Sequence, residues 1–182
     1  MRERFSTRMG VRVFDLDAQG HLTGAAHLQY ANHTLWECVR AAGVNVDALL
    51  ASGVGPVNLE TKIRFLRELR GGDEVDVSCE LAFSDDRTYQ VHHEFRTREG
   101  ALAADVTCRF GLLDLKRRRL VLDPASRWRQ FARHPQLLNL DRTIAPNKPR
   151  PTGAWASRSY RQLAGRSSAS PSSSSDPVIT VT

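Results

Sequence analysis

The chain has 182 residues, of which 41% are hydrophobic and 25% are charged, a balance typical of one globular domain with a tail. No stretch approaches the roughly 20 consecutive apolar residues that a transmembrane helix requires, which excludes a membrane span. The net charge of +6 and pI of about 9.8 permit an anionic ligand, namely nucleic acid, an acidic membrane surface or a phosphate-bearing cofactor. The net charge by itself is explained at least as well by a solvated basic surface with no specific partner as by an anionic ligand.

The N-terminal segment and the cysteines indicate a cytoplasmic protein. Residues 1–9 are charged and lack the apolar core of a signal peptide. Cys38, Cys79 and Cys108 share no metal-binding spacing, and a sparse, odd number of cysteines suits a reducing compartment. We expect buried thiols, and neither a metal nor a cofactor.

The first half of the chain predicts a strand, a loop and a helix. Residues 9–14 alternate apolar and basic side chains, as in a strand, and the polar residues 15–23 predict a loop. Residues 25–42 carry apolar side chains at helical spacing, and Gly43 is a typical helix end. A short helical turn is expected over residues 47–52.

Four further strands follow, joined by short turns rich in Gly or Asp. Alternating patterns cover residues 57–66, 74–83, 88–96 and 101–113. Short turns favour antiparallel neighbours, so we predict an α+β fold with a five-stranded antiparallel sheet covered on one face by the helix. The other face, or an edge, must be solvated or paired with a partner chain.

The C-terminal quarter changes in composition. Residues 123–133 predict a last short helix, whereas the segment from about residue 141 is rich in Pro and Ser and poor in apolar side chains. Such a segment gains too little from burial to offset its ordering entropy. We therefore predict a folded domain over residues 1–140 and a disordered tail over residues 141–182.

Residues with catalytic potential gather between the first strand and the helix. Asp15 and Asp17 are followed by His21, and the helix begins near Gly24. A helix N-terminus offers free N–H groups for a developing oxyanion, and a nearby carboxylate can attack an acyl group or activate water. Taken alone, these residues fit N-capping and turn formation better than catalysis.

The segment from Asp15 to Arg40 resembles the signature of the 4-hydroxybenzoyl-CoA thioesterase and related acyl-CoA thioesterase family. The motif reads Asp-x-Asp-x-x-Gly-His and continues into the helix, and the resemblance extends over roughly residues 5–122. Six positions match without a gap: Asp15, Asp17, Gly20, His21, Leu28 and Tyr30.

This resemblance implies a hotdog fold, in which an antiparallel sheet wraps around one long central helix. It implies a homodimer or homotetramer with the active site at a subunit interface. It further implies that Asp17 is the nucleophile or general base, that the Gly24 backbone N–H polarises the thioester carbonyl, and that His21 supports the site.

The resemblance also suggests three substrate-binding residues, His27, Tyr30 and Arg87. His27 replaces a usual Tyr, and it either lines the acyl pocket or faces the sheet. Arg87 either meets a CoA phosphate or is solvated in its turn, and Arg117–Arg119 fit a solvated turn better. Thr23-Gly24 stands in place of the usual Asn-Asn pair, so any role of an Asn side chain there is lost.

We therefore predict an acyl-CoA thioesterase. The alternatives are an acyl-carrier-protein thioesterase, whose surface arginines would meet an acidic partner, and a non-catalytic acyl-CoA-binding protein of the same fold. A dehydratase is disfavoured because no Asn-Pro lies between Asp17 and His21. Nucleic-acid binding is disfavoured because no motif of aromatic and basic residues supports it.

Overall fold

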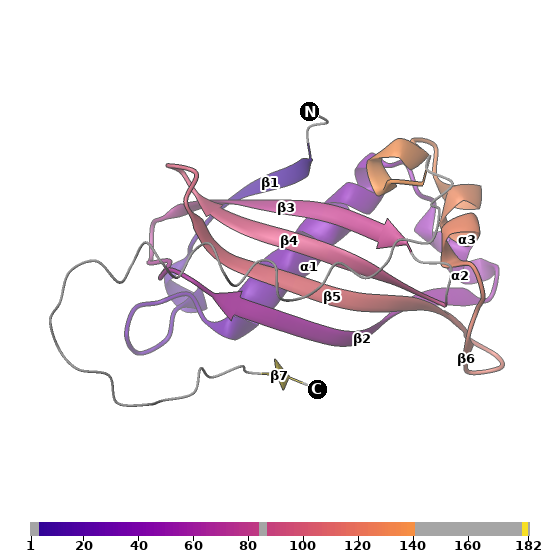
Figure 1. Cartoon of the computed structure of the whole chain (residues 1–182), viewed down its shortest axis with the longest axis horizontal. Helices are drawn as coiled ribbons and strands as arrows, with labels where there is room; N and C mark the ends of the chain where they lie inside the picture. Colours follow the sequence, from indigo (N-terminus) through magenta and orange to yellow (C-terminus); the bar gives the residue numbers. More distant parts are fainter. Residues whose placement is uncertain (1–3, 84–86, 141–179, 182) are drawn as a thin grey trace, which may run out of the picture.

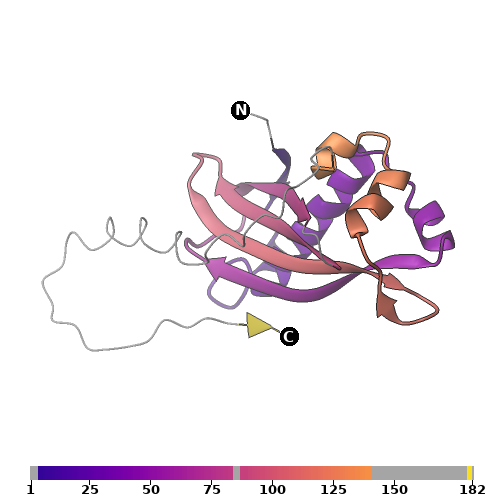
Figure 2. The ribbon, with the colours of Figure 1, turned by 45° about the vertical axis from the view of Figure 1, so that its right-hand side comes forward.

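The computed structural model describes residues 4–83, 87–140 and 180–181. It contains a long helix, an antiparallel sheet and two shorter helices at one end (Figures 1 and 2). The strands are β1 (Phe5–Gly10), β2 (Val54–Phe65), β3 (Glu74–Phe83), β4 (Thr88–Thr97), β5 (Leu102–Asp114), β6 (Arg119–Leu120) and β7 (Thr180–Val181). The helices are α1 (Gly24–Ala41), α2 (Val46–Ala51) and α3 (Pro124–Phe131), with short 3-10 helices η1 (Val13–Asp15) and η2 (Pro135–Leu138).

Helix α1 begins and ends where local chemistry dictates. The Thr23 side chain accepts a hydrogen bond from the Ala26 N–H at 3.1 Å and so caps the N-terminus. Gly43, with φ of +67°, occupies the left-handed conformation that terminates many helices. Between these ends one side of α1 is buried, and the helix crosses one face of the sheet diagonally (Figure 1).

The sheet has the strand order β1-β3-β4-β5-β2-β7, with β6 paired to β5. Its register aligns Val77, Phe95, Ala104 and Phe65 in one row across β3, β4, β5 and β2. Directly paired residues share a face of a sheet. Because Val77, Phe95 and Ala104 are fully buried, this row belongs to the face covered by α1, and Phe65 is its outer end on β2.

The opposite face of the sheet is polar and crossed by ion pairs. Arg64 pairs with Asp105 at 3.0 Å, and Arg8 pairs with Asp76 at 2.8 Å. This face satisfies the predicted alternation, with apolar residues toward the helix and charged residues away from it.

Residues 124–140 pack onto one end of the sheet. Trp128 of α3 is 2% exposed and meets the Tyr89 ring edge-on at 6.2 Å. Leu138 and Leu140 are also buried, so the core extends at least to the last residue described before the tail. Apart from Thr180 and Val181, the predicted disordered tail lies outside the described residues, and the boundary at residue 140 stays a prediction.

The first strand differs from the sequence-based expectation. It spans Phe5–Gly10 rather than residues 9–14, and Val13, which with Val11 suggested the alternation, is 82% exposed. Val11 still exchanges hydrogen bonds with the Gly72–Asp73 turn, after which the chain coils into η1. The remaining predicted elements are present with shifts of a few residues at their ends, and two-residue strands β6 and β7 bring the sheet to seven strands.

Candidate active site

The loop between η1 and α1 is closed by its own backbone. The Asp17 N–H donates to the His21 carbonyl at 2.8 Å, and the Gly20 N–H donates to the Asp17 carbonyl at 3.0 Å. Gly20 has φ of +80°, a conformation that side chains disfavour, which explains the glycine of the motif. The loop therefore holds Asp17 and His21 beside each other.

Asp17 presents an ionised carboxylate at the surface of this loop. Its Oδ1 accepts hydrogen bonds from the N–H groups of Gln19 at 2.8 Å and His21 at 3.0 Å. These bonds, that of His21 foremost, lower the pKa of Asp17 below its ordinary value. Asp17 is therefore negatively charged at neutral pH.

Asp15 has a different environment, although it lies only two residues away. It is 5% exposed, and its Oδ2 accepts hydrogen bonds from Arg12 Nε and from the Tyr30 hydroxyl, both at 2.8 Å. The Arg12 guanidinium, helped by Tyr30, lowers the pKa of this carboxyl group. Its carbonyl also accepts the Thr23 N–H at 3.0 Å. Asp15 thus attaches the loop to helix α1.

The start of α1 supplies free backbone donors. The N–H groups of the first helical turn have no acceptor within the helix, and Thr23 satisfies only that of Ala26. Among the described residues, none accepts the Gly24 N–H. A Cβ on Gly24 would lie 3.5 Å from Phe65 Cζ, so the helix start packs closely against the end of β2.

The His21 side chain points toward the segment that follows β2. Its Nε2 lies 3.2 Å from Glu68 Oε2, which also accepts a hydrogen bond from Arg70. An open depression of about 470 Å³ begins beside this group, and its lining carries both signs of charge. His21 therefore joins the site through its backbone, whereas its imidazole contacts Glu68.

His27 faces the sheet from the second turn of α1. It is 2% exposed, its Nδ1 lies 2.9 Å from the Thr23 carbonyl, and its ring contacts those of Phe65 and Phe95, each at 5.1 Å between centroids. Of the two roles predicted for His27, the orientation toward the sheet is the one observed, and contact with an acyl group stays a prediction.

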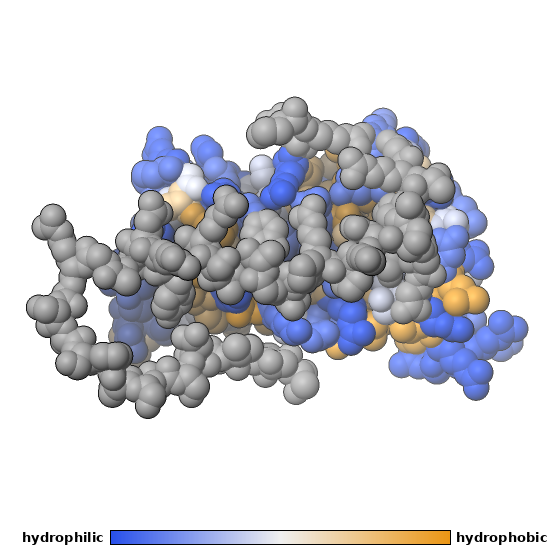
Figure 3. Space-filling model, in the orientation of Figure 1, coloured by the Kyte–Doolittle hydropathy of each residue, from blue (hydrophilic) through white to orange (hydrophobic). Residues whose placement is uncertain are grey.

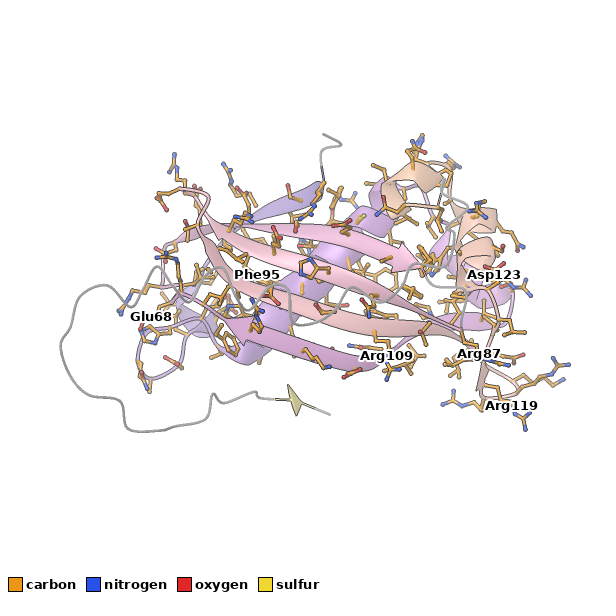
Figure 4. All side chains as sticks on the ribbon, in the orientation of Figure 1. Glu68, Arg87, Phe95, Arg109, Arg119 and Asp123 are labelled. Carbon is orange, nitrogen blue, oxygen red and sulfur yellow. The ribbon has the colours of Figure 1, made fainter. Side chains whose placement is uncertain are left out.

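Tyr30 and Arg87 do not lie beside Asp17 in the way His21 does. The Tyr30 hydroxyl is engaged with Asp15 and lies 3.1 Å from the Gly10 carbonyl. Arg87 donates from Nη1 to the Leu120 carbonyl at 2.8 Å, and Figure 4 places it at the opposite end of the sheet from Glu68. Any contact of Arg87 with a substrate at Asp17 of the same chain would have to span the sheet.

Sequence reasoning missed three residues that shape this site. Arg12 forms an ion pair with Asp15, Glu68 lies 3.2 Å from His21 Nε2, and Phe65 packs against both Gly24 and His27. Of these three residues, only Arg12 could have been found from the sequence, because it lies three residues before Asp15. Within residues 4–83 and 87–140, no group of three His, Cys, Asp or Glu side chains is placed to hold a metal ion. No helix in the described part of the chain is long and apolar enough to cross a membrane.

A curled antiparallel sheet covered by one long helix, with a carboxylate loop leading into the helix N-terminus, defines the class of hotdog thioesterases. The family model of the thioesterase-like superfamily matches residues 11–138, which is most of the chain. The chain belongs to this superfamily. The narrower 4-hydroxybenzoyl-CoA subfamily suggested by the motif is not established by this match.

Known relatives agree with this assignment. The chloroplast acyl-acyl carrier protein thioesterase ATL3 of Arabidopsis thaliana is 30% identical over 97 residues, 53% of this chain and 51% of that protein. The chain thus matches about half the length of this curated relative.

Two solved structures share the fold. The 1,4-dihydroxy-2-naphthoyl-CoA thioesterase of Synechocystis has a TM-score of 0.63 at 16% identity, covering 70% of this chain and 94% of its own. The Staphylococcus aureus protein SAV2348, solved in complex with CoA, has a TM-score of 0.66 at 18% identity, covering 94% and 98%.

Replacing Tyr30 by Phe should destabilise the protein by about 1.5 to 3 kcal/mol at pH 7, because the Asp15 carboxylate loses a buried donor. The pKa of Asp15 is lowered in the folded state, so its stabilising contribution is complete above the ordinary carboxyl pKa of about 3.9 and disappears as pH falls through the folded value. The difference between variant and wild type should therefore shrink below about pH 4, as measured by urea unfolding across pH.

A Tyr89→Phe variant serves as the control, since Tyr89 is equally buried and far from Asp15 in the sequence. Its effect should not depend on pH between 3 and 7. A Tyr30→Phe variant with unchanged stability but a raised KM would instead favour the substrate-binding role predicted from the motif.

Proposed function

We propose that this protein hydrolyses acyl-CoA thioesters, with Asp17 as the nucleophile. The observation that carries the proposal is the ionised Asp17 carboxylate in a loop closed by its own backbone hydrogen bonds. This loop leads to the start of α1, where the Gly24 N–H has no acceptor among the described residues. Membership of the thioesterase-like superfamily supports thioester hydrolysis as the reaction class.

The reaction would proceed in two steps. The thioester carbonyl oxygen accepts the Gly24 N–H, Asp17 Oδ2 attacks the carbonyl carbon, and the C–S bond breaks with release of the thiolate, which takes a proton from solvent. Water then hydrolyses the resulting anhydride and restores Asp17. In the alternative route, the ionised Asp17 carboxylate takes a proton from a water molecule, which attacks the same carbonyl carbon. One oxyanion donor is worth about 3 kcal/mol in the barrier.

Asp17→Asn should lower kcat at least a thousandfold, because the amide is neither a nucleophile nor a base. Released thiol should be measured against short, long and aromatic acyl-CoAs. Asp47→Asn, which changes an exposed carboxylate on α2, is the matched control and should retain full activity. Undiminished hydrolysis by a pure, folded Asp17→Asn variant would contradict the mechanism.

We further propose a homodimer formed along β2. Within the described part of the chain, its outer edge is paired only at Thr61 and Lys62, with β7, and Leu59 is 40% exposed on this strand. An exposed strand edge with apolar side chains is a pairing surface. Strand β2 runs from Val54, next to the β5–β6 hairpin, to Phe65 beside Gly24. A two-fold axis near its middle would bring the partner's hairpin to this chain's site and displace β7.

The dimer is tested by the mass in solution, which should be twice the 20.4 kDa of one chain by light scattering. Leu59→Lys should shift the protein toward monomer and reduce kcat, because a monomer lacks the partner's half of the site. Leu137→Lys, on η2, should do neither, because this leucine is 38% exposed, close to the 40% of Leu59, and does not belong to β2. A fully active monomer would contradict this proposal.

A carrier-protein thioester is the second candidate substrate. The β5–β6 hairpin carries four exposed basic residues, Lys116, Arg117, Arg118 and Arg119, and the Asp114 carboxylate accepts hydrogen bonds from the backbone N–H groups of the first two. Figure 3 shows a hydrophilic projection at this end of the molecule, and Figure 4 places Arg119 on it. Such a cluster complements an acidic carrier protein, and one relative is named for carrier-protein substrates.

Charge reversal distinguishes the two substrates. In Arg117→Glu/Arg119→Glu, kcat/KM for an acyl-carrier-protein ester should fall roughly tenfold or more relative to the CoA ester of the same acyl chain, because electrostatic steering is lost. The effect should weaken at high salt. Arg98→Glu, in the β4–β5 turn at the other end, should leave the ratio unchanged. Equal losses for both esters would favour CoA phosphates as the ligand of the hairpin.

A further inference from the structure

The second turn of α1 contains a buried hydrogen-bond acceptor that the proposed reaction does not use. His27 Nε2 is buried and has no hydrogen-bond partner among the described residues. Buried polar side-chain atoms are nearly always paired, because leaving one unpaired costs about 1 to 3 kcal/mol. An unpaired atom in such a place points to a ligand.

The chemistry of this atom follows from the other ring nitrogen. A carbonyl oxygen can only accept, so His27 Nδ1, 2.9 Å from the Thr23 carbonyl, carries the proton. Burial lowers the pKa of His27, which keeps the imidazole neutral at pH 7. Nε2 therefore presents a lone pair and requires a donor.

The surroundings of His27 connect it to the proposed oxyanion site. Its ring lies against Phe65 and Phe95, which flank the small Ala104 in one row of the sheet. Gly24, three residues earlier and thus on the same side of α1, packs against the same Phe65 ring. Gly24 and His27 therefore share the Phe65 ring as a neighbour, at the exposed end of the row.

Phe65 is the side chain that controls approach to this acceptor. It ends β2 and is 50% exposed, whereas Phe95 on the inner side is fully buried. A ligand that reaches His27 Nε2 from the surface would have to displace the half-exposed Phe65 ring, since Phe95 lies on the inner side.

We propose that His27 is a specificity-determining residue whose Nε2 accepts a hydrogen bond from a hydroxyl group on the acyl chain, a few bonds from the thioester carbonyl. The proposal rests on the proposed function, because it places that carbonyl at the Gly24 N–H. Hydroxyacyl thioesters are thereby preferred to unsubstituted acyl thioesters of equal length.

The test compares 3-hydroxydecanoyl-CoA with decanoyl-CoA as substrates of the full-length protein. Wild type should show a higher kcat/KM for the hydroxylated ester, and His27→Phe, which fills the space without an acceptor, should reduce this ratio at least tenfold. His93→Phe is the matched control, since His93 is an equally buried histidine on the same face of the sheet, and it should keep the ratio. An unchanged ratio in folded His27→Phe overturns the proposal.

Two further measurements distinguish the His27 proposal from the proposed hydrolysis, and from an effect of misfolding in the variant. Non-hydrolysable thioether analogues of both ligands measure binding alone. If wild type hydrolyses neither ester but binds the hydroxylated analogue more tightly, and His27→Phe loses this difference, hydrolysis is refuted and the His27 site stands. In wild type, the ¹⁵N resonance of His27 Nε2 should shift with the hydroxylated analogue only, and the same shift with both analogues overturns the proposal.

Discussion

The contact between the Tyr30 hydroxyl and the Asp15 carboxylate determines the geometry of the whole site. Tyr30 belongs to helix α1 and Asp15 to the short helix η1, so this 2.8 Å hydrogen bond joins the catalytic loop to the core. The Arg12 guanidinium donates to the buried Asp15 carboxylate from the solvent side. The Asp15 carbonyl accepts a hydrogen bond from the Thr23 N–H, just before α1. A buried carboxylate is tolerated only when it is paired and hydrogen-bonded in this way. Asp15 therefore positions the loop, whereas Asp17 stays exposed at its surface.

The two carboxylates of the motif show how environment separates roles. Both pKa values are lowered, yet Asp15 owes this to Arg12 and Tyr30, whereas Asp17 owes it to the backbone of its own loop. Backbone donors of a closed loop stabilise the charge without enclosing the second oxygen. Asp17 can thus be ionised and still accessible, which a side-chain ion pair would not readily permit.

Local patterns predicted the elements well because most of them depend on nearby residues. The bounds of β3 and the course of α1 follow from alternation and helical spacing, and Asp17, His21 and Gly24 lie together because the loop between them is short. The first strand was misplaced because Val11 and Val13 alternate with Arg12 as in a strand, yet Val11 is buried and Val13 is exposed. The contacts of His27 with Phe65 and Phe95 could not be predicted, since they depend on strand register and on the side of α1 that packs against the sheet.

Strand β2 has a consequence for how such a protein can diversify. The loop over residues 15–23 is held by hydrogen bonds of its own backbone, by Arg12 and Tyr30, and by the bond from the Leu22 N–H to the Leu69 carbonyl. The surfaces that we propose for acyl groups and for carrier proteins, at Phe65 and at the β5–β6 hairpin, lie at the two ends of β2. Phe65 packs against Gly24, so a substitution at that end reaches the start of α1, whereas the hairpin lies at the other end of the strand. The hairpin can therefore change with less effect on the loop than Phe65 can.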